Sequence, residues 1–189
     1  DSGGRHSLQI FARASRAGCS GRPARRCSTE YQLVFSGLKL HPTLVQSVKT
    51  LGFVTPTPVQ SQAIPKALEG RDLLACAATG SGKTAAFLLP ILHQLLDRPR
   101  GTTRALVLAP TRELALQIRD DFVGLARNTG LRGAAVHGGV GIGPQEKAFR
   151  TGVDVLVATP GRLLDHFSRD YARLDGLEYL VLDEADRML

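Results

Sequence analysis

The residues best suited to chemistry lie in a glycine-rich stretch, AATGSGKT at positions 77–84. Gly80 and Gly82 allow the backbone to turn its N–H groups toward a polyphosphate, and a helix starting directly after the loop points its positive dipole end the same way. Lys83 adds a charge for the outer phosphates, and the hydroxyl of Thr84 is a ligand for Mg²⁺. The stretch therefore predicts a nucleotide-binding loop.

The segments on either side of this loop favour the same interpretation. Residues 73–76 (LLAC) predict a buried strand, and residues 85–89 (AAFLL) open a packed helix. A strand, a glycine-rich turn, Gly-Lys-Thr and a helix follow one another in the phosphate loops of nucleotide hydrolases. Ala77 stands where the general pattern has its first glycine, so a chance glycine-rich turn is the alternative. The flanking elements favour nucleotide binding.

Asp183 and Glu184 follow another aliphatic run, much later in the chain. Asp183 can hold Mg²⁺, directly or through water, opposite Thr84. Glu184 can orient the attacking water or accept its proton. The alternative is a pair of acids that caps a following helix, where carboxylates favour the positive dipole end. The phosphate loop makes the catalytic interpretation the stronger one.

A second set of polar or small residues follows other predicted strands. Arginine makes bidentate contacts to phosphodiester oxygens, threonine offers a hydroxyl, and glycine lets a sugar–phosphate backbone approach closely. Surface ion pairs for the arginines and an ordinary turn for the glycines are the alternatives. Aromatic residues make up only 5% of the chain, which disfavours binding through base stacking. We expect contacts to a nucleic-acid backbone, with little sequence preference, from Arg112, Gly138, Gly139, Thr159 and Arg162.

One further polar residue, Gln60, ends the stretch GFVTPTPVQ at positions 52–60. The two prolines of this stretch fix an extended, rigid segment that can hold one side chain still. The amide of Gln60 offers a donor and an acceptor, the pairing that reads the edge of an adenine. The alternative role is that of a residue at the start of a helix.

Aliphatic runs that alternate with helical periods must position these residues. Such runs predict a parallel sheet covered by helices on both faces, with ligands at the carboxyl ends of the strands. The fold class is therefore α/β. A helix is expected over residues 41–51, and further strands are expected over residues 104–109, 134–136, 154–158 and 178–182.

Length and charge set the remaining limits. The 189 residues are 43% apolar, ordinary for a globular protein, and no apolar run reaches the ~20 residues that span a bilayer. Residues 1–29 hold six arginines against one acidic residue and so carry most of the net charge of +7. Three cysteines show no metal spacing, and Cys76, expected to be buried in a strand, suits a reducing compartment.

The basic segment at the start predicts a disordered tail. Its arginine, serine and alanine content also resembles an organelle transit peptide, and translated sequence absent from the mature protein is a third possibility. We expect a cytoplasmic protein, or an organellar one if residues 1–29 are a transit peptide. The chain begins with Asp1 and ends just after an acidic motif, which predicts a fragment.

Taken in order, the motifs resemble those of the DEAD-box RNA helicases over residues 35–189. Residues 52–60 resemble the Q motif, with Phe35 upstream of it, and AATGSGKT resembles motif I, in which a first alanine is normal. PTRELA, GG, TPGR and the literal DEAD at 183–186 resemble motifs Ia, GG, Ib and II. The stretch from His137 to Gln145 is similar to bacterial members.

This resemblance implies a RecA-like domain that works with ATP, Mg²⁺ and single-stranded RNA, with residues 1–34 as a basic tail. Phe35 and Gln60 would recognise adenine. Lys83, Asp183 and Glu184 would serve hydrolysis, with Thr84 and Asp183 at the Mg²⁺. Asp186 would couple ATP to RNA, which would lie on Arg112, Gly139, Thr159 and Arg162. The triphosphate would be bound by Ala78, Thr79, Gly80, Ser81, Gly82, Lys83 and Thr84.

The departures from the family pattern concern its later motifs. The Ser-Ala-Thr motif, the last strand of the domain and the second RecA-like domain are absent from these residues. We therefore expect the 189-residue stretch alone to be inactive, and the parent protein to unwind RNA. The alternatives are a phosphate-loop ATPase that translocates on DNA and a non-catalytic module that binds or anneals RNA.

Overall fold

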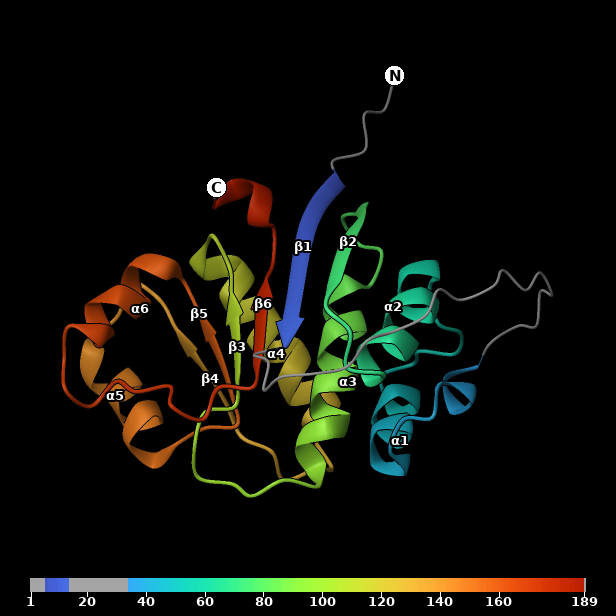
Figure 1. Ribbon diagram of the computed structural model, residues 1–189, viewed down its shortest axis with the longest axis horizontal. Helices are drawn as coiled ribbons and strands as arrows, with labels where there is room; N and C mark the ends of the chain where they lie inside the picture. Colours follow the sequence, from blue (N-terminus) through green and yellow to red (C-terminus); the bar gives the residue numbers. More distant parts are fainter. Residues whose placement is uncertain (1–5, 14–33, 189) are drawn as a thin grey trace.

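The computed structural model describes residues 6–13 and 34–188 and places one six-stranded sheet at its centre (Figure 1). Four neighbouring strands pair in parallel, in the order β6-β3-β5-β4. This arrangement confirms the predicted α/β class with a mostly parallel sheet. The parallel strands are β3 (Ala105–Leu108), β4 (Gly133–Val136), β5 (Val155–Ala158) and β6 (Tyr179–Leu182).

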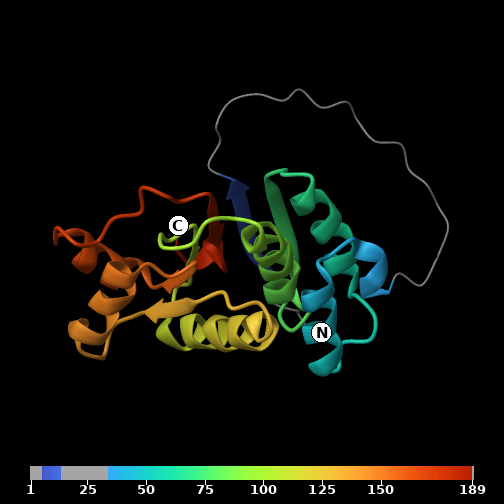
Figure 2. The same cartoon turned by 90° about the horizontal axis from the view of Figure 1, so that it is seen from below.

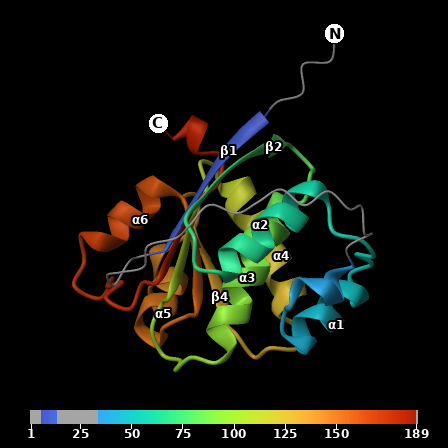
Figure 3. The ribbon, with the colours of Figure 1, turned by 45° about the vertical axis from the view of Figure 1, so that its right-hand side comes forward.

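Helices cover both faces of this sheet (Figures 2 and 3). The larger core joins one face of the sheet to the first four helices, and the smaller core joins the other face to the last two. The first group is α1 (Pro42–Thr50), α2 (Pro58–Leu68), α3 (Lys83–Leu96) and α4 (Arg112–Ala126). The second group is α5 (Ile142–Thr151) and α6 (Pro160–Phe167). Two short 3₁₀ turns complete the elements: η1 (Phe35–Leu38) precedes α1, and η2 (Ala185–Arg187) follows β6.

The two cores follow from the alternation of side chains along each strand. In β5, Val155 and Val157 belong to the larger core, whereas Leu156 and Ala158 belong to the smaller one. All four are almost completely buried, which explains why the strand is aliphatic throughout. Among the described residues, no helix combines the length and apolarity needed to cross a membrane.

The first strand of the sheet, β1 (His6–Arg13), departs from the sequence-based prediction. It lies between β6 and β2 (Leu73–Ala78) and is antiparallel to both. The disordered tail predicted for residues 1–34 is therefore wrong at His6–Arg13, because two neighbouring strands offer backbone partners that composition does not reveal. Residues 1–5 and 14–33 of that predicted tail lie outside the described residues.

Strand β2 also differs, because it forms the edge of the sheet and only one of its faces is covered. Its residues alternate between half-buried and exposed, with Leu74 at 69% exposure. Cys76 is a free, exposed thiol, so the expectation that it is a buried apolar residue is wrong. Helix α2 packs against the other face of the strand.

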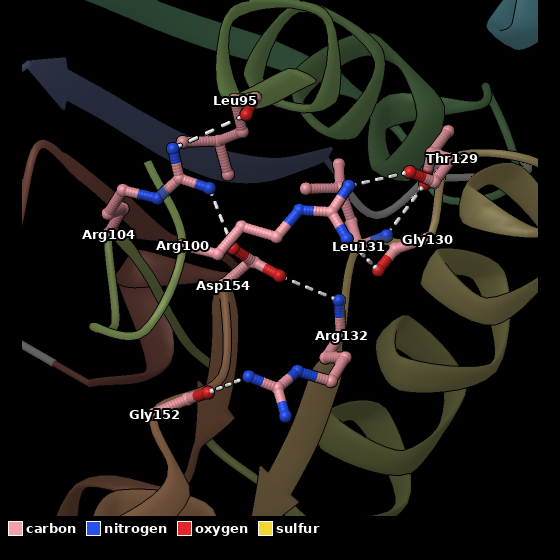
Figure 4. A network of polar contacts seen from close by, with 9 residues as sticks. All are labelled: Leu95, Arg100, Arg104, Thr129, Gly130, Leu131, Arg132, Gly152 and Asp154. Carbon is pink, nitrogen blue, oxygen red and sulfur yellow. Dashed lines mark hydrogen bonds and ion pairs between the residues drawn. The ribbon is translucent and has the colours of Figure 1, made fainter. Parts of the chain in front are cut away.

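At the end of the sheet where the parallel strands begin, a buried ion pair and its hydrogen bonds tie four segments together (Figure 4). Arg104 lies 2.6 Å from the carboxylate of Asp154, and the same guanidinium donates to the carbonyl of Leu95 at 3.3 Å. The second carboxylate oxygen accepts from the backbone N–H of Arg132 at 2.8 Å. Because the two charges of this buried pair compensate each other, removing one partner would leave an uncompensated charge in the interior.

Candidate nucleotide site and nucleic-acid interface

The predicted site residues gather at the opposite end of the sheet, where the parallel strands finish. Each strand passes there into a turn or helix that carries one of the predicted motifs. The carboxyl ends of parallel strands meet at one edge, which is why motifs far apart in sequence come together. That edge holds a cavity of about 540 Å³ between the loop at 79–84, the helix α4 and the end of β6.

The glycine-rich loop lines the cavity and depends on glycine at Gly82. Its φ angle is +83°, in the left-handed region, and an added Cβ would lie 2.4 Å from Nε2 of Gln60. Helix α3 begins directly after it, so its N-terminal N–H groups face the cavity. Gly80, with φ of +78°, makes the preceding turn. The turn and the helix start that the sequence predicts are therefore both present.

Lys83 is buried and its ammonium group is held by the loop itself. Nζ donates to the carbonyls of Ala77 at 2.7 Å and Ala78 at 3.0 Å. In the same loop, Oγ of Ser81 is buried and has no hydrogen-bond partner among the described residues. A polyphosphate would supply acceptors for both groups, so the loop fits an anion better than it fits its own interior.

Gln60 joins the second helix to this loop and takes the helix-start role considered for it, while its role toward an adenine stays a prediction. Its Oε1 accepts from the backbone N–H of Thr57 at 3.0 Å, which completes a capping box at the start of α2. Its Nε2 donates to the carbonyl of Gly82 at 3.0 Å. The side chain lines the cavity, so the amide is held against the loop at the place where a base could reach it.

The two aromatic residues near Gln60 take different positions. Phe35, predicted to recognise adenine, is 3% exposed and does not line the cavity. Its ring lies 6.5 Å from that of Phe53, in a stacked arrangement. Phe53 is 43% exposed and lines the cavity, so Phe35 supports the aromatic surface that Phe53 presents. Phe53 lies within the predicted motif at residues 52–60, but its place in the sequence alone predicted no role for it.

Asp183 and Glu184 line the same cavity as Thr84. Asp183 is buried, and its backbone N–H is bonded to the carbonyl of Leu108 at 2.9 Å, which fixes it at the end of β6. Glu184 has a left-handed backbone, with φ of +49°, and its carboxylate lies 3.0 Å from Arg187. A hydroxyl and two carboxylates around one cavity suit a hard cation such as Mg²⁺.

One face of α4 completes the cavity wall, and none of the residues on this face was predicted to belong to the site. Leu114, Gln117, Asp121 and Gly124 recur at helical spacing and line the cavity. Burial raises the pKa of the Asp121 carboxyl, while a hydrogen bond from Thr84 opposes that shift. The helical period of this segment was visible in the sequence, but the direction of its polar face was not.

Three of the four predicted RNA-contacting residues lie together beside this cavity edge. Gly139, with φ of +83°, has Nη1 of Arg112 3.1 Å from where its Cβ would be. Arg162 donates to the carbonyl of Val140 at 2.9 Å, so its guanidinium is held beside the same turn. Arg112 is exposed and its charge is shared with Glu113, which raises the pKa of the guanidinium.

The two remaining predicted site residues, Thr159 and Asp186, lie at the start of a helix and in a 3₁₀ turn. Thr159 is the N-cap residue of α6, and its side chain makes no capping bond. Asp186 lies in η2 and is exposed. Behind the turn at Gly139, the buried side chains of Gln145 and His166 were missed by the sequence analysis, because helical periodicity alone does not mark a buried polar pair.

The sequence profile of the DEAD/DEAH box helicases matches residues 57–189. The chain is 47% identical over 90% of its length to the "Probable ATP-dependent RNA helicase ddx27" of Dictyostelium discoideum, covering 22% of that protein. It is 49% identical over 82% of its length to the "ATP-dependent rRNA helicase RRP3" of Candida albicans, covering 29% of it. A third relative, the "DEAD-box ATP-dependent RNA helicase 28" of Arabidopsis thaliana, is 49% identical over 82% of the chain and is covered to 20%.

The chain therefore spans between about a fifth and a third of the length of these relatives. All three come from eukaryotes, so the similarity of residues 137–145 to bacterial members stays a prediction. The matched region includes the glycine-rich loop, Asp183 and Glu184, the groups that surround the cavity. The match over residues 57–189 shows that the chain belongs to the DEAD/DEAH box helicase family.

Proposed function

We propose that the protein containing this domain is an ATP-dependent RNA helicase that uses Mg²⁺ and remodels short RNA duplexes. One observation carries the proposal: a single cavity brings the glycine-rich loop together with Asp183 and Glu184, at the same end of the sheet as the turn at Gly139 and its neighbour Arg112. The names of the relatives support RNA as the partner. Little sequence preference is expected, since the residues at the turn suit backbone contacts.

The residues in the cavity have distinct tasks in this proposal. Lys83 leaves the carbonyls of Ala77 and Ala78 and turns toward the outer phosphates. Thr84 and Asp183 would hold Mg²⁺, partly through water, and the ion would supply positive charge beside the phosphates. Glu184 orients the attacking water and takes its proton. Phe53 and Gln60 bind the base.

The proposal is tested by replacing Glu184, the proposed general base. We expect Glu184→Gln in the full-length protein to reduce RNA-stimulated ATP hydrolysis by at least about a hundredfold, the scale of general-base catalysis. Hydrolysis is measured with and without single-stranded RNA. The control is Glu69→Gln, the same change at an exposed carboxylate paired with Arg71, and it should leave turnover unchanged. A rate of ATP hydrolysis that is unchanged by RNA, or unchanged by Glu184→Gln, would contradict the proposal.

Two comparisons separate this proposal from the alternatives. A DNA translocase would be stimulated by single-stranded DNA at least as strongly as by RNA. A non-catalytic module that binds through its basic segment would lose most of its affinity and salt dependence when that segment is neutralised. Because β1 occupies residues 6–13, the informative variant keeps that strand and replaces the later arginines by glutamine, at Arg16, Arg22, Arg25 and Arg26.

A further inference from the structure

A buried chain of polar side chains lies directly behind the turn at Gly138 and Gly139. Oε1 of Gln145, in α5, lies 3.1 Å from Nε2 of His166, in α6. The other ring nitrogen of His166 lies 2.9 Å from the hydroxyl of Tyr171. At the opposite end, Nε2 of Gln145 donates to the backbone carbonyl of His137 at 2.9 Å. Gln145 and His166 are 5% and 0% exposed.

The chemistry of these groups fixes the direction of every hydrogen bond. The carbonyl of His137 can only accept, so Gln145 presents its amide nitrogen to it and its oxygen to His166. That oxygen also only accepts, so Nε2 of His166 carries the proton. Nδ1 of the neutral ring then accepts from the hydroxyl of Tyr171. One tautomer satisfies the whole chain, and burial, with Arg162 and Arg169, lowers the pKa of His166 and favours that neutral ring.

The chain of bonds ends on the backbone of the turn and not on another core side chain. His137 directly precedes Gly138, and on the far side of the turn the carbonyl of Val140 accepts from Arg162. The turn is therefore anchored on both sides of its two glycines. Burying polar side chains costs more free energy than burying apolar side chains of the same size. Because this row of hydrogen bonds ends on the backbone of the turn, it is suited to fixing the position of the turn.

We propose that Gln145 and His166 are positioning residues for RNA binding. They hold the backbone of the Gly138–Gly139 turn in the form that lies against Arg112, with Arg162 at its side. Neither side chain touches RNA. This inference rests on the proposed function, because the positioned surface is the one expected to bind the RNA backbone.

The decisive variant is Gln145→Glu in the full-length protein. It keeps the size and the acceptor that faces His166 but loses the N–H that anchors His137. We expect about tenfold weaker binding of single-stranded oligouridine RNA, the scale of one lost anchoring hydrogen bond, with unchanged affinity for ADP. Faster hydrogen–deuterium exchange at Gly138 and Gly139 should accompany the loss. Tyr171→Phe removes only the far end of the chain and should weaken RNA binding two- to threefold.

Two control variants separate positioning from simple loss of stability. Gln46→Glu makes the same change at an exposed position of α1 and should affect neither ligand. Asp154→Asn destabilises the opposite end of the sheet and should leave RNA affinity unchanged in the folded protein.

Two outcomes would overturn the inference in different ways. The Gln145→Glu and Tyr171→Phe proteins could melt at lower temperature but bind RNA like the wild type. That result would show that these hydrogen-bonded side chains have only a structural role. A wild-type protein that binds ADP but no RNA would overturn the proposed function and this inference with it. If Gln145→Glu does not fold, Tyr171→Phe alone decides, through its RNA affinity and the exchange rates of the turn.

Discussion

At the scale of single residues, His166 makes stability depend on pH. Burial lowers its pKa below the ordinary value of 6.5, with Arg162 and Arg169 adding to the shift and Asp165 and Glu146 opposing it. The unfolded chain therefore binds a proton more readily than the folded one. The stabilisation from a neutral His166 is complete above about pH 6.5 and is lost as the pH falls below that value toward the folded-state pKa.

We expect the free energy of unfolding to fall between pH 7.5 and 5.5, by at most about 1.4 kcal/mol per pH unit for this one group. The pKa of His93 is also lowered by burial, so it adds to the fall. Urea denaturation of wild type and His166→Gln at both pH values separates the two contributions. A pH dependence that is identical in the two proteins would assign the effect to other groups.

The residue types predicted the phosphate loop and the acidic pair, because Gly82, Lys83 and Asp183 have chemical roles that few other residues can take. They did not predict that Phe35 is buried under Phe53, since two aromatic residues near one motif are equivalent in sequence. The hydrogen-bonded pair of Gln145 and His166 was also out of reach. Its two members lie on different helices, and only packing brings them together.

At the scale of elements, β1 supplies backbone partners to two strands at once. His6–Phe11 pair with β2, and Ile10–Arg13 pair with β6. Deleting residues 1–13 would leave both partners with unpaired N–H and C=O groups, and such edges lower stability and favour self-association. We expect a lower melting temperature and concentration-dependent oligomers, measured by calorimetry and sedimentation. A monomer that melts like the intact chain would show that β1 contributes nothing to the sheet.

The elements inside the sheet were predictable, because β3 and β5 are continuous aliphatic runs, and β6 is a continuous apolar one, as expected of strands covered on both faces. β1 was missed for a physical reason. Its sequence, HSLQIFAR, has apolar residues at Leu8, Ile10 and Ala12, the alternation of a strand with Phe11 as an exception, but it is surrounded by arginine, serine and glycine. Composition averaged over the longer segment concealed the local period.

At the scale of the whole molecule, electrostatic attraction to RNA depends on where charges lie and not on their sum. Arg112 is exposed beside the Gly139 turn and should contact one phosphate. We expect Arg112→Gln to weaken binding to all RNA sequences alike and to lower the slope of log affinity against log salt by about one. Titrations at several salt concentrations measure this. Arg127→Gln, an equal change of charge just after α4, is the control and should leave the slope unchanged.

One end of the sheet contributes mainly to stability and the other end carries the cavity, so mutations at the two ends should give different phenotypes. The buried pair of Arg104 and Asp154 lies where the parallel strands begin, away from the cavity at their carboxyl ends. Losing one partner of such a pair costs about 3–5 kcal/mol, enough to unfold a marginal domain on warming without altering its chemistry when cold. We therefore expect heat-sensitive alleles from changes in the codons for Arg104 and Asp154, and null alleles at every temperature from changes in the codons for Lys83 and Glu184.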